Sequence, residues 1–257
     1  MHGTHYPVRD LQRQHWEDDW TCFRRWCERA GLFFWFEHSN GFHRLVIADH
    51  MGAFASHGEA YKTLRYAPGD NRIDEEHIER LAFSSRQTEG KATAVDHDYM
   101  QPRMRAANAP LRASEDHPRN TAEADQEFYE PANISQPLQG AQGLNGRPLD
   151  RDEQARRVAL VRQQSMRCQG LRAKGSGHLR ALIPGYTFDL TEHPLEKANQ
   201  EYLVVSATLT IESNDQSSGT DQAFRCDTEF ELYPVQADIS VCRSSRRGQL
   251  RAPRLPS

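Results

Sequence analysis

The sequence predicts a β-rich α+β protein that contains two amphipathic helices and a helix–hairpin subdomain. Three observations support this: aromatic residues recur at helical spacing near the start, residues 201–212 alternate with period two, and Pro and Gly turn signals separate the apolar runs. With 257 residues, the chain can bury a real core in one large domain or two smaller ones.

The first helix is expected around residues 16–30. Three acids at residues 17–19 suit a helix N-terminus, and Gly31 suits its end. The expected buried stripe has spacings of 4, 3, 4 and 3 and consists of Trp16, Trp20, Phe23, Cys27 and Ala30. An aromatic strand at 32–37, a turn at Ser39-Asn40-Gly41 and a strand at 42–48 then predict a hairpin.

The middle of the chain is harder to interpret. Strands are expected at 78–86 and 90–99, whereas the prolines and glycines of residues 100–149 favour long loops or extended sheet edges. A second helix begins at Asp150, where Glu153 gives the spacing of a capping box, and Gly170 closes it. Its expected apolar stripe consists of Ala155, Val158, Ala159, Val161 and Met166.

Residues 201–212 form the clearest strand. Its odd-numbered residues are expected to be buried: Leu203, Val205, Ala207, Leu209 and Ile211. A Pro184-Gly185 turn, a strand at 186–190 and a polar loop from His193 to Asn199 precede it. After a polar turn at 214–219, a strand at 223–233 should pair back on it, and residues 234–257 are expected to form a disordered or divergent tail.

Composition excludes some classes of function. The net charge of −4 gives no strong basic field, so a nucleic-acid partner is not indicated. No apolar run approaches the roughly 20 residues that span a bilayer, and the N-terminus lacks the apolar core of a signal peptide. The five cysteines contain no Cys-x-x-Cys pair, so free thiols in a reducing cytoplasm are expected instead of disulfides or a zinc site.

Residue types that can carry chemistry are present, but no pattern joins them. The histidines lack metal-binding spacing on a helix, including His38, His43, His50 and His57 near the hairpin. Ser176, Asp189 and His193 contain the residue types of a hydrolytic triad, but Gly175-Ser176-Gly177 is not a nucleophile elbow, and a strand is expected to follow it. Asp96, His97, Asp98 and the acids of Glu127–Glu130 lack predicted proximity. We therefore predict no catalytic, cofactor-binding or metal-binding residue.

Two ordered sets of residues make the sequence similar to a known family. The first is Gly175-Ser176-Gly177, then Leu-x-x-Leu-x-Pro-Gly-x-x-Phe-x-Leu from Leu179 to Leu190, then His193-Pro194, then Asn-x-x-Tyr-Leu-Val-Val from Asn199. The second is the acidic helix start, Leu-Phe-Phe-Trp-Phe-Glu from Leu32 and His-x-Leu-Val-Ile-Ala-Asp from His43. Together they resemble the VgrG and Rhs-element Vgr family of type VI secretion spike tips, over roughly residues 5–233. The Tyr129-Glu130-Pro131 segment departs from the family by lacking a glycine.

The resemblance implies a phage baseplate hub-like fold and a structural, non-enzymatic role. It implies a homotrimer that docks on the hexameric Hcp tube, with effectors or adaptors as further partners, and a protein that stays cytoplasmic until the type VI apparatus secretes it. Because the pattern stops near residue 234, a truncated copy is expected. The expected regions are a helix–hairpin subdomain at 1–60, a loop-rich region at 61–149, a helix with antiparallel strands at 150–233 and a tail at 234–257. The alternatives are a prophage tail hub and a cell-wall glycan hydrolase that uses carboxylates such as Asp189 and Glu192.

Overall fold

The computed structural model describes Tyr6 and residues 12–69, 75–96, 111–116, 120–131, 151–212 and 225–235. These residues fall into two compact units, each built from segments that are distant in sequence. One unit combines the chain up to Phe33 with Gln87–Gln169, and the other combines Phe34–Arg86 with the chain from Gly170. The four expected regions remain a prediction. The expected polar turn at 214–219, the tail beyond Val235, and Asp150 lie outside the described residues.

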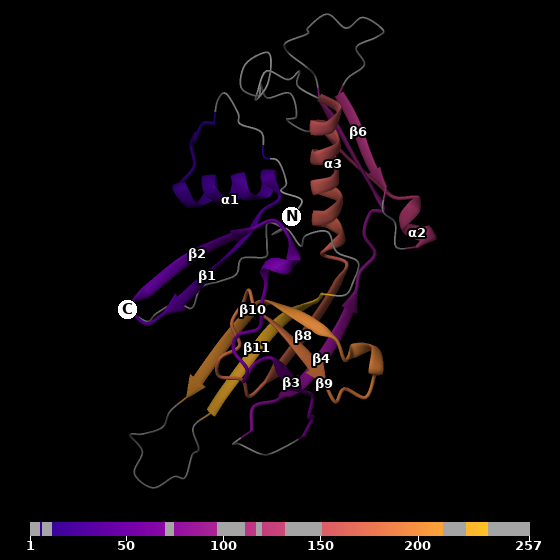
Figure 1. Ribbon diagram of the computed structural model, residues 1–257. Helices are drawn as coiled ribbons and strands as arrows, with labels where there is room; N and C mark the ends of the chain where they lie inside the picture. The colour runs from indigo at the N-terminus through magenta and orange to yellow at the C-terminus, as the bar shows by residue number, and fades with distance from the viewer. Residues whose placement is uncertain are drawn as a thin grey trace, which may run out of the picture. The chain divides into compact units, whose positions relative to one another are not determined.

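A six-stranded sheet forms the centre of the second unit (Figure 1). Its order is β3-β9-β10-β11-β8-β4. The strands are β3 (Thr63–Arg65), β4 (Ile78–Ser85), β8 (Leu171–Gly177), β9 (Thr187–Thr191), β10 (Glu201–Glu212) and β11 (Arg225–Pro234). The predicted strands at 78–86, 186–190, 201–212 and 223–233 are therefore confirmed to within about two residues. The pairing of β11 back on β10 is confirmed as well.

The sheet curls until its two ends meet. Tyr66, directly after β3, forms an isolated parallel bridge to Ile78 at the start of β4. The Ala67 N–H donates to the Ile78 carbonyl at 2.9 Å, and the Tyr66 N–H donates to the Thr191 carbonyl at 2.9 Å. A curled sheet encloses its concave face, and one apolar core fills it. The buried members of this core are Tyr61, Leu64, Ile78, Ala173, Leu179, Leu182, Phe188, Leu190, Ala198, Tyr202, Val204, Phe230 and Leu232.

The expected alternation along β10 is wrong. The strand buries Tyr202, Leu203 and Val204 in succession, whereas Leu209 and Ile211 are 45% and 55% exposed. Two features explain the difference. The register shifts between Val204 and Ser206, which moves the later side chains to the opposite faces. In addition, β9 pairs with only Glu201–Leu203, so the second half of β10 leaves the cover of the sheet.

The loop before β10 is confirmed as a polar connection. It contains the short 3-10 helix η3 (Glu196–Ala198). The Asn199 amide closes it, because Asn199 Oδ1 accepts from the His193 N–H at 2.9 Å and Asn199 Nδ2 donates to the His193 carbonyl at 3.0 Å. The Pro184-Gly185 turn is confirmed too, with Gly185 at φ +91.

The predicted hairpin consists of β1 (Phe33–Ser39) and β2 (Phe42–Ala48), which form a two-stranded sheet, and the 3-10 helix η1 (Met51–Ala53) follows it. Gly41 has φ +74, which the tight turn between the strands requires. Trp35 anchors the hairpin: its ring lies 4.9 Å from that of Phe54, and a Cβ on Gly185 would lie 2.7 Å from Trp35 Cγ. Only glycine at 185 allows this close approach.

The first unit contains α1 (Asp19–Ala30), α3 (Arg151–Arg167) and a three-stranded sheet of order β6-β5-β7. The strands are β5 (Lys91–Asp96), β6 (Leu111–Asp116) and β7 (Glu127–Pro131), and the short helix α2 (Thr121–Ala124) precedes β7. The two strands from the Pro- and Gly-rich stretch, β6 and β7, flank β5 on either side. The sequence-based expectation of extended edges is thus confirmed there. On α3, Ala159 and Val161 are buried as predicted, together with Gln163 and Gln164, which were not.

Helix α1 ends as predicted, but it begins at Asp19, three residues after Trp16, and its expected stripe is only partly right. Asp18 caps the helix by accepting from the Thr21 N–H at 2.6 Å, and Gly31 ends it in the left-handed conformation at φ +73. Cys27 is buried as expected, whereas Trp16 precedes the helix and is 93% exposed. The bidentate Arg25–Glu17 ion pair holds this lead-in, and that hydrogen bonding lowers the pKa of Glu17.

Candidate interaction surface

The second half of β10 and its partner on β11 form an arm, defined here as Ser206–Glu212 with Arg225–Glu231. Within the described part of the chain, β11 is the ladder partner of this half of β10, and its other edge carries no strand. No charged residue interrupts β10 from Tyr202 to Ile211. Natural proteins often protect such an edge with charged side chains, so an uncharged open edge favours pairing with another chain.

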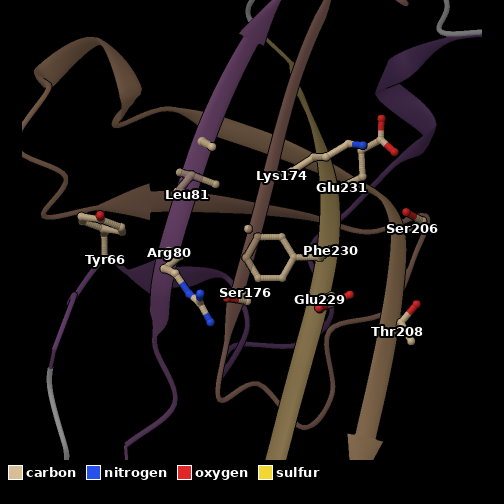
Figure 2. A pocket seen from close by; sticks show the side chains of 12 residues that line it. Tyr66, Arg80, Leu81, Lys174, Ser176, Ser206, Thr208, Glu229, Phe230 and Glu231 are labelled. Atoms are coloured by element: carbon tan, nitrogen blue, oxygen red, sulfur yellow. The ribbon is translucent and has the colours of Figure 1, made fainter.

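A groove of about 570 Å³ lies on the sheet, and part of the arm lines it (Figure 2). Register places two rows of side chains across four strands. One row reads Thr208, Glu229, Ser176 and Arg80, and the other reads Ser206, Glu231, Lys174 and Ala82. Because the neighbouring positions Phe230 and Ala173 belong to the core, these rows project from the opposite face of the sheet.

The charges of the groove are arranged by strand. Arg80 and Lys174 come from β4 and β8, whereas Glu229 and Glu231 come from β11. Arg172 Nε lies 3.1 Å from Glu231 Oε1. Arg80, Lys174 and Glu229 form no ion pair with another residue that the structure describes, so their charges face solvent or a partner. The face thus has a cationic side and an acidic side.

Gly175 is the residue that gives this part of the sheet its shape. A Cβ at position 175 would lie 2.5 Å from the Arg80 carbonyl oxygen and 2.6 Å from the Phe230 ring. The Phe230 ring therefore lies across the backbone of β8 on the core side, where a side chain would otherwise stand. Gly175, Ser176 and Gly177 lie inside β8, which corrects the expectation that a strand follows them.

The structure does not assemble the hydrolytic residue types. Ser176 lies on β8 and Asp189 on β9, and β10 and β11 lie between those strands. His193 Nδ1 accepts from the Leu195 N–H at 3.1 Å, and its ring packs 4.5 Å from that of Tyr66. The imidazole is thus part of the loop, and no triad geometry exists among these three residues. Glu192, the other carboxylate named for a glycan hydrolase, is exposed and has φ +61.

The acids of the first unit are not brought together at Glu127. Glu127 pairs in register with Lys91, and its side chain accepts from the Thr93 hydroxyl. Asp96 is at the opposite end of β5, paired with Leu111. His97 and Asp98, and the side chains of Asp96 and Glu130, lie outside the described residues.

Two of the four hairpin histidines meet. His38 Nδ1 and His43 Nδ1 are 2.6 Å apart, whereas His50 lies beyond the hairpin and His57 packs on Tyr186 with ring centroids 4.9 Å apart. The predicted Asn40-Gly41 turn already implied this pair, because a two-residue loop places position 38 opposite position 43. Among the described residues, no group of three or more His, Cys, Asp or Glu side chains is arranged to hold a metal ion.

The buried Tyr61 hydroxyl has two structural partners. Tyr61 donates to Glu76 and accepts from the Ala181 N–H at 2.8 Å. Burial, followed by the hydrogen bond to Glu76, raises the pKa of Tyr61 to about 12. Cys22, Cys27, Cys168 and Cys226 are buried free thiols, and burial raises the pKa of Cys27 to about 11. The raised pKa makes Cys27 a poor nucleophile at neutral pH.

A family model named phage tail baseplate hub (GPD) matches residues 1–215. The chain belongs to the phage tail baseplate hub family. Family membership agrees with the β-rich fold and the curled sheet.

Within this family the chain is similar to spike proteins of type VI secretion. It is 26% identical over 199 residues to the spike protein VgrG1b and 26% identical over 228 residues to VgrG1a, both of Pseudomonas aeruginosa. These alignments cover 77% and 88% of the chain but only 24% and 32% of the relatives. The chain thus spans about a quarter to a third of their length. The resemblance stated from its motifs is confirmed.

Two solved structures share the fold. A tail protein of Neisseria meningitidis matches with a TM-score of 0.54 at 13% identity, covering 89% of this chain and 60% of the other. A type VI secretion component of E. coli, described as similar to the T4 phage tail proteins gp27 and gp5, matches with a TM-score of 0.51 at 13% identity, covering 94% and 44%. The expected hub-like fold is therefore confirmed. In the part of the chain that is described, no helix is long and apolar enough to cross a membrane.

Proposed function

We propose that this chain is a structural, non-enzymatic hub region at the spike tip of a type VI secretion system. The observation that supports it most is the arm: an uncharged strand edge with exposed Leu209 and Ile211, on a chain related to VgrG spike proteins. Its work is mechanical, because binding energy comes from buried strand and side-chain surface at contacts between chains.

The proposed assembly is a homotrimer. In a closed threefold ring each subunit offers one surface to the next and receives a different one, so every copy uses two distinct surfaces. The open edge of β10 is our candidate for one of them. The groove is our candidate for the other, because its cationic and acidic sides can fix the orientation of a charged neighbour.

The proposed partners of the trimer are the hexameric Hcp tube and an effector or adaptor protein. No nucleic acid and no stable membrane insertion are proposed. The protein remains in the cytoplasm until the contracting apparatus secretes it.

The decisive experiment is the solution mass by light scattering, with and without Hcp. We expect a mass near three times the 29.5 kDa of one chain and a complex with the Hcp ring. A double variant, Leu209→Lys with Ile211→Lys, should reduce the mass to one chain, because lysines on the edge oppose strand pairing. The matched control is Leu45→Lys, a similarly exposed leucine on β2. A wild-type monomer that ignores Hcp contradicts the proposal.

The family match also favours a second candidate, a tail hub of a prophage, because the matching family model is a phage baseplate hub. The mechanical role would be the same, but the docking partner would be a phage tail tube. Side-by-side binding to an Hcp ring and to a phage tube ring distinguishes the two.

A further inference from the structure

The tip of the β1–β2 hairpin brings two imidazoles together. His38 is the sixth residue of β1 and His43 the second of β2, on either side of the Asn40-Gly41 turn. Their Nδ1 atoms are 2.6 Å apart, and the ring centroids are 4.8 Å apart at 70°. At this distance one Nδ1–H donates to the lone pair of the other Nδ1. The two Nδ1 atoms therefore face each other across the end of the hairpin.

Neighbouring residues of the hairpin hold this histidine pair in place. Arg44 Nε donates to Glu37 Oε2 at 2.9 Å, which ties the two strands together next to the histidines. The His38 ring stacks on Phe36 at 6.3 Å and 21°. Since Trp35 anchors β1 against Gly185 and Phe54, the strands do not need to reorganise to present the imidazoles.

The donor set fits a divalent transition metal. Neutral imidazole is a ligand for Zn²⁺, Ni²⁺ and Cu²⁺, at about 2.0–2.1 Å from the metal for zinc. Two nitrogens at that distance on one ion lie roughly 3.0–3.4 Å apart, for angles between octahedral and tetrahedral. Both rings are exposed, so a small rotation provides this separation and leaves room for water as the remaining ligands. The Glu37 carboxylate offsets the nearby charge of Arg44.

We propose that His38 and His43 form a two-histidine site for a divalent transition metal ion. The ring that carries its proton on Nδ1 takes the tautomer protonated on Nε2, so both Nδ1 lone pairs bind the ion, which clamps the end of the β1–β2 hairpin. The ion crosslinks the strands at the end opposite the Trp35 anchor. This site is independent of the arm and of the groove, so its failure would leave the proposed hub function untouched.

The test is isothermal titration of the tag-free full chain with Zn²⁺ and, separately, with Ni²⁺. We expect one ion per chain, and at least a tenfold loss of affinity in His38→Ala and in His43→Ala. His50→Ala is the matched control, because His50 is an exposed histidine just beyond the same hairpin, and it should bind as the wild type does. His43→Cys should retain zinc binding, since a thiolate is also a zinc ligand.

Three results would overturn the site. These are no binding at millimolar metal, equal affinity in the His38→Ala and His43→Ala variants, or an equal loss in the His50→Ala control. Circular dichroism of each variant distinguishes a lost ligand from a lost fold: a variant with the wild-type spectrum and no metal binding supports the site, and so does retained binding in His43→Cys.

Discussion

The two halves of β10 have similar side chains and opposite surroundings. The first half, Glu201–Val204, lies between β9 with its preceding turn on one side and β11 on the other, and it buries Tyr202 to 1% exposure. The second half, Ser206–Glu212, has β11 alone among the described residues and leaves Leu209 and Ile211 open. The difference shows that an apolar residue in a strand is buried or left exposed according to how many strands pair with its own strand.

The largest effect should come from the enclosed half. Tyr202→Ala removes a fully buried ring and its hydrogen bond to the Ala198 carbonyl, so we expect a loss of about 3–5 kcal/mol in the free energy of unfolding. Leu209→Ala, in the open half, should lower the free energy of unfolding by less than about 1 kcal/mol, because the Leu209 side chain is already exposed to solvent. Urea unfolding measures both. Equal losses would mean that the two halves do not differ.

The next effect concerns the glycine over which Phe230 lies. Gly175→Ala places a methyl group 2.5 Å from the Arg80 carbonyl oxygen, so the ring and β4 must shift, at a cost of about 1–3 kcal/mol. The neighbouring Ser176→Ala, on the groove face, should stay within about 0.5 kcal/mol. Thermal unfolding of the pair sharpens the contrast between the two faces of one strand. An unchanged midpoint for Gly175→Ala would refute the close packing.

Alkaline pH should weaken the enclosed core selectively. The pKa of Tyr61 is raised to about 12, against about 10 in an unfolded chain. The stabilisation is complete below pH 10 and is lost as pH rises toward 12, by about 2–3 kcal/mol. Tyr61→Phe should flatten this decline, although burial also raises the pKa of Tyr186 and Tyr202 and leaves a residual slope. Unfolding free energies from pH 8 to 11.5 decide it; an identical slope in both proteins argues against the shift.

The smallest effect is kinetic. Cys226 pairs with Ile211 in the arm and is buried, and burial raises its pKa. Among the described residues, the end of β11 at Cys226 pairs with β10 and lies beyond the residues that pair with β8. Local opening should therefore expose Cys226 to a thiol reagent at least tenfold faster than Cys168, the thiol at the end of α3. Mass spectrometry of a Cys242→Ser background measures the two rates. Equal rates would indicate that the arm opens only when the whole chain unfolds.

Local patterns in the sequence were sufficient for most element positions. The Asp18 cap region, Gly31, the Asn40-Gly41 turn and Pro184-Gly185 act over a few residues, so their effect can be predicted without tertiary contacts. The same holds for the Tyr202–Ile211 run, whose β-branched and hydroxyl residues favour a strand in many settings. The position of the Asn40-Gly41 turn also places His38 and His43 on facing strands.

The sequence by itself determined both long helices, the hairpin, the strands β4, β5, β9, β10 and β11, and the motifs that relate the chain to baseplate hubs. Only the tertiary structure decided which face of β10 is buried, because that depends on a bulge at Val205 and on where β9 ends. Only the tertiary structure separated Ser176 from Asp189 and placed Arg80 opposite Glu229 across a groove, since strand order follows from long-range pairing. Local propensity acts within a segment, whereas neighbours distant in sequence decide what each side chain faces.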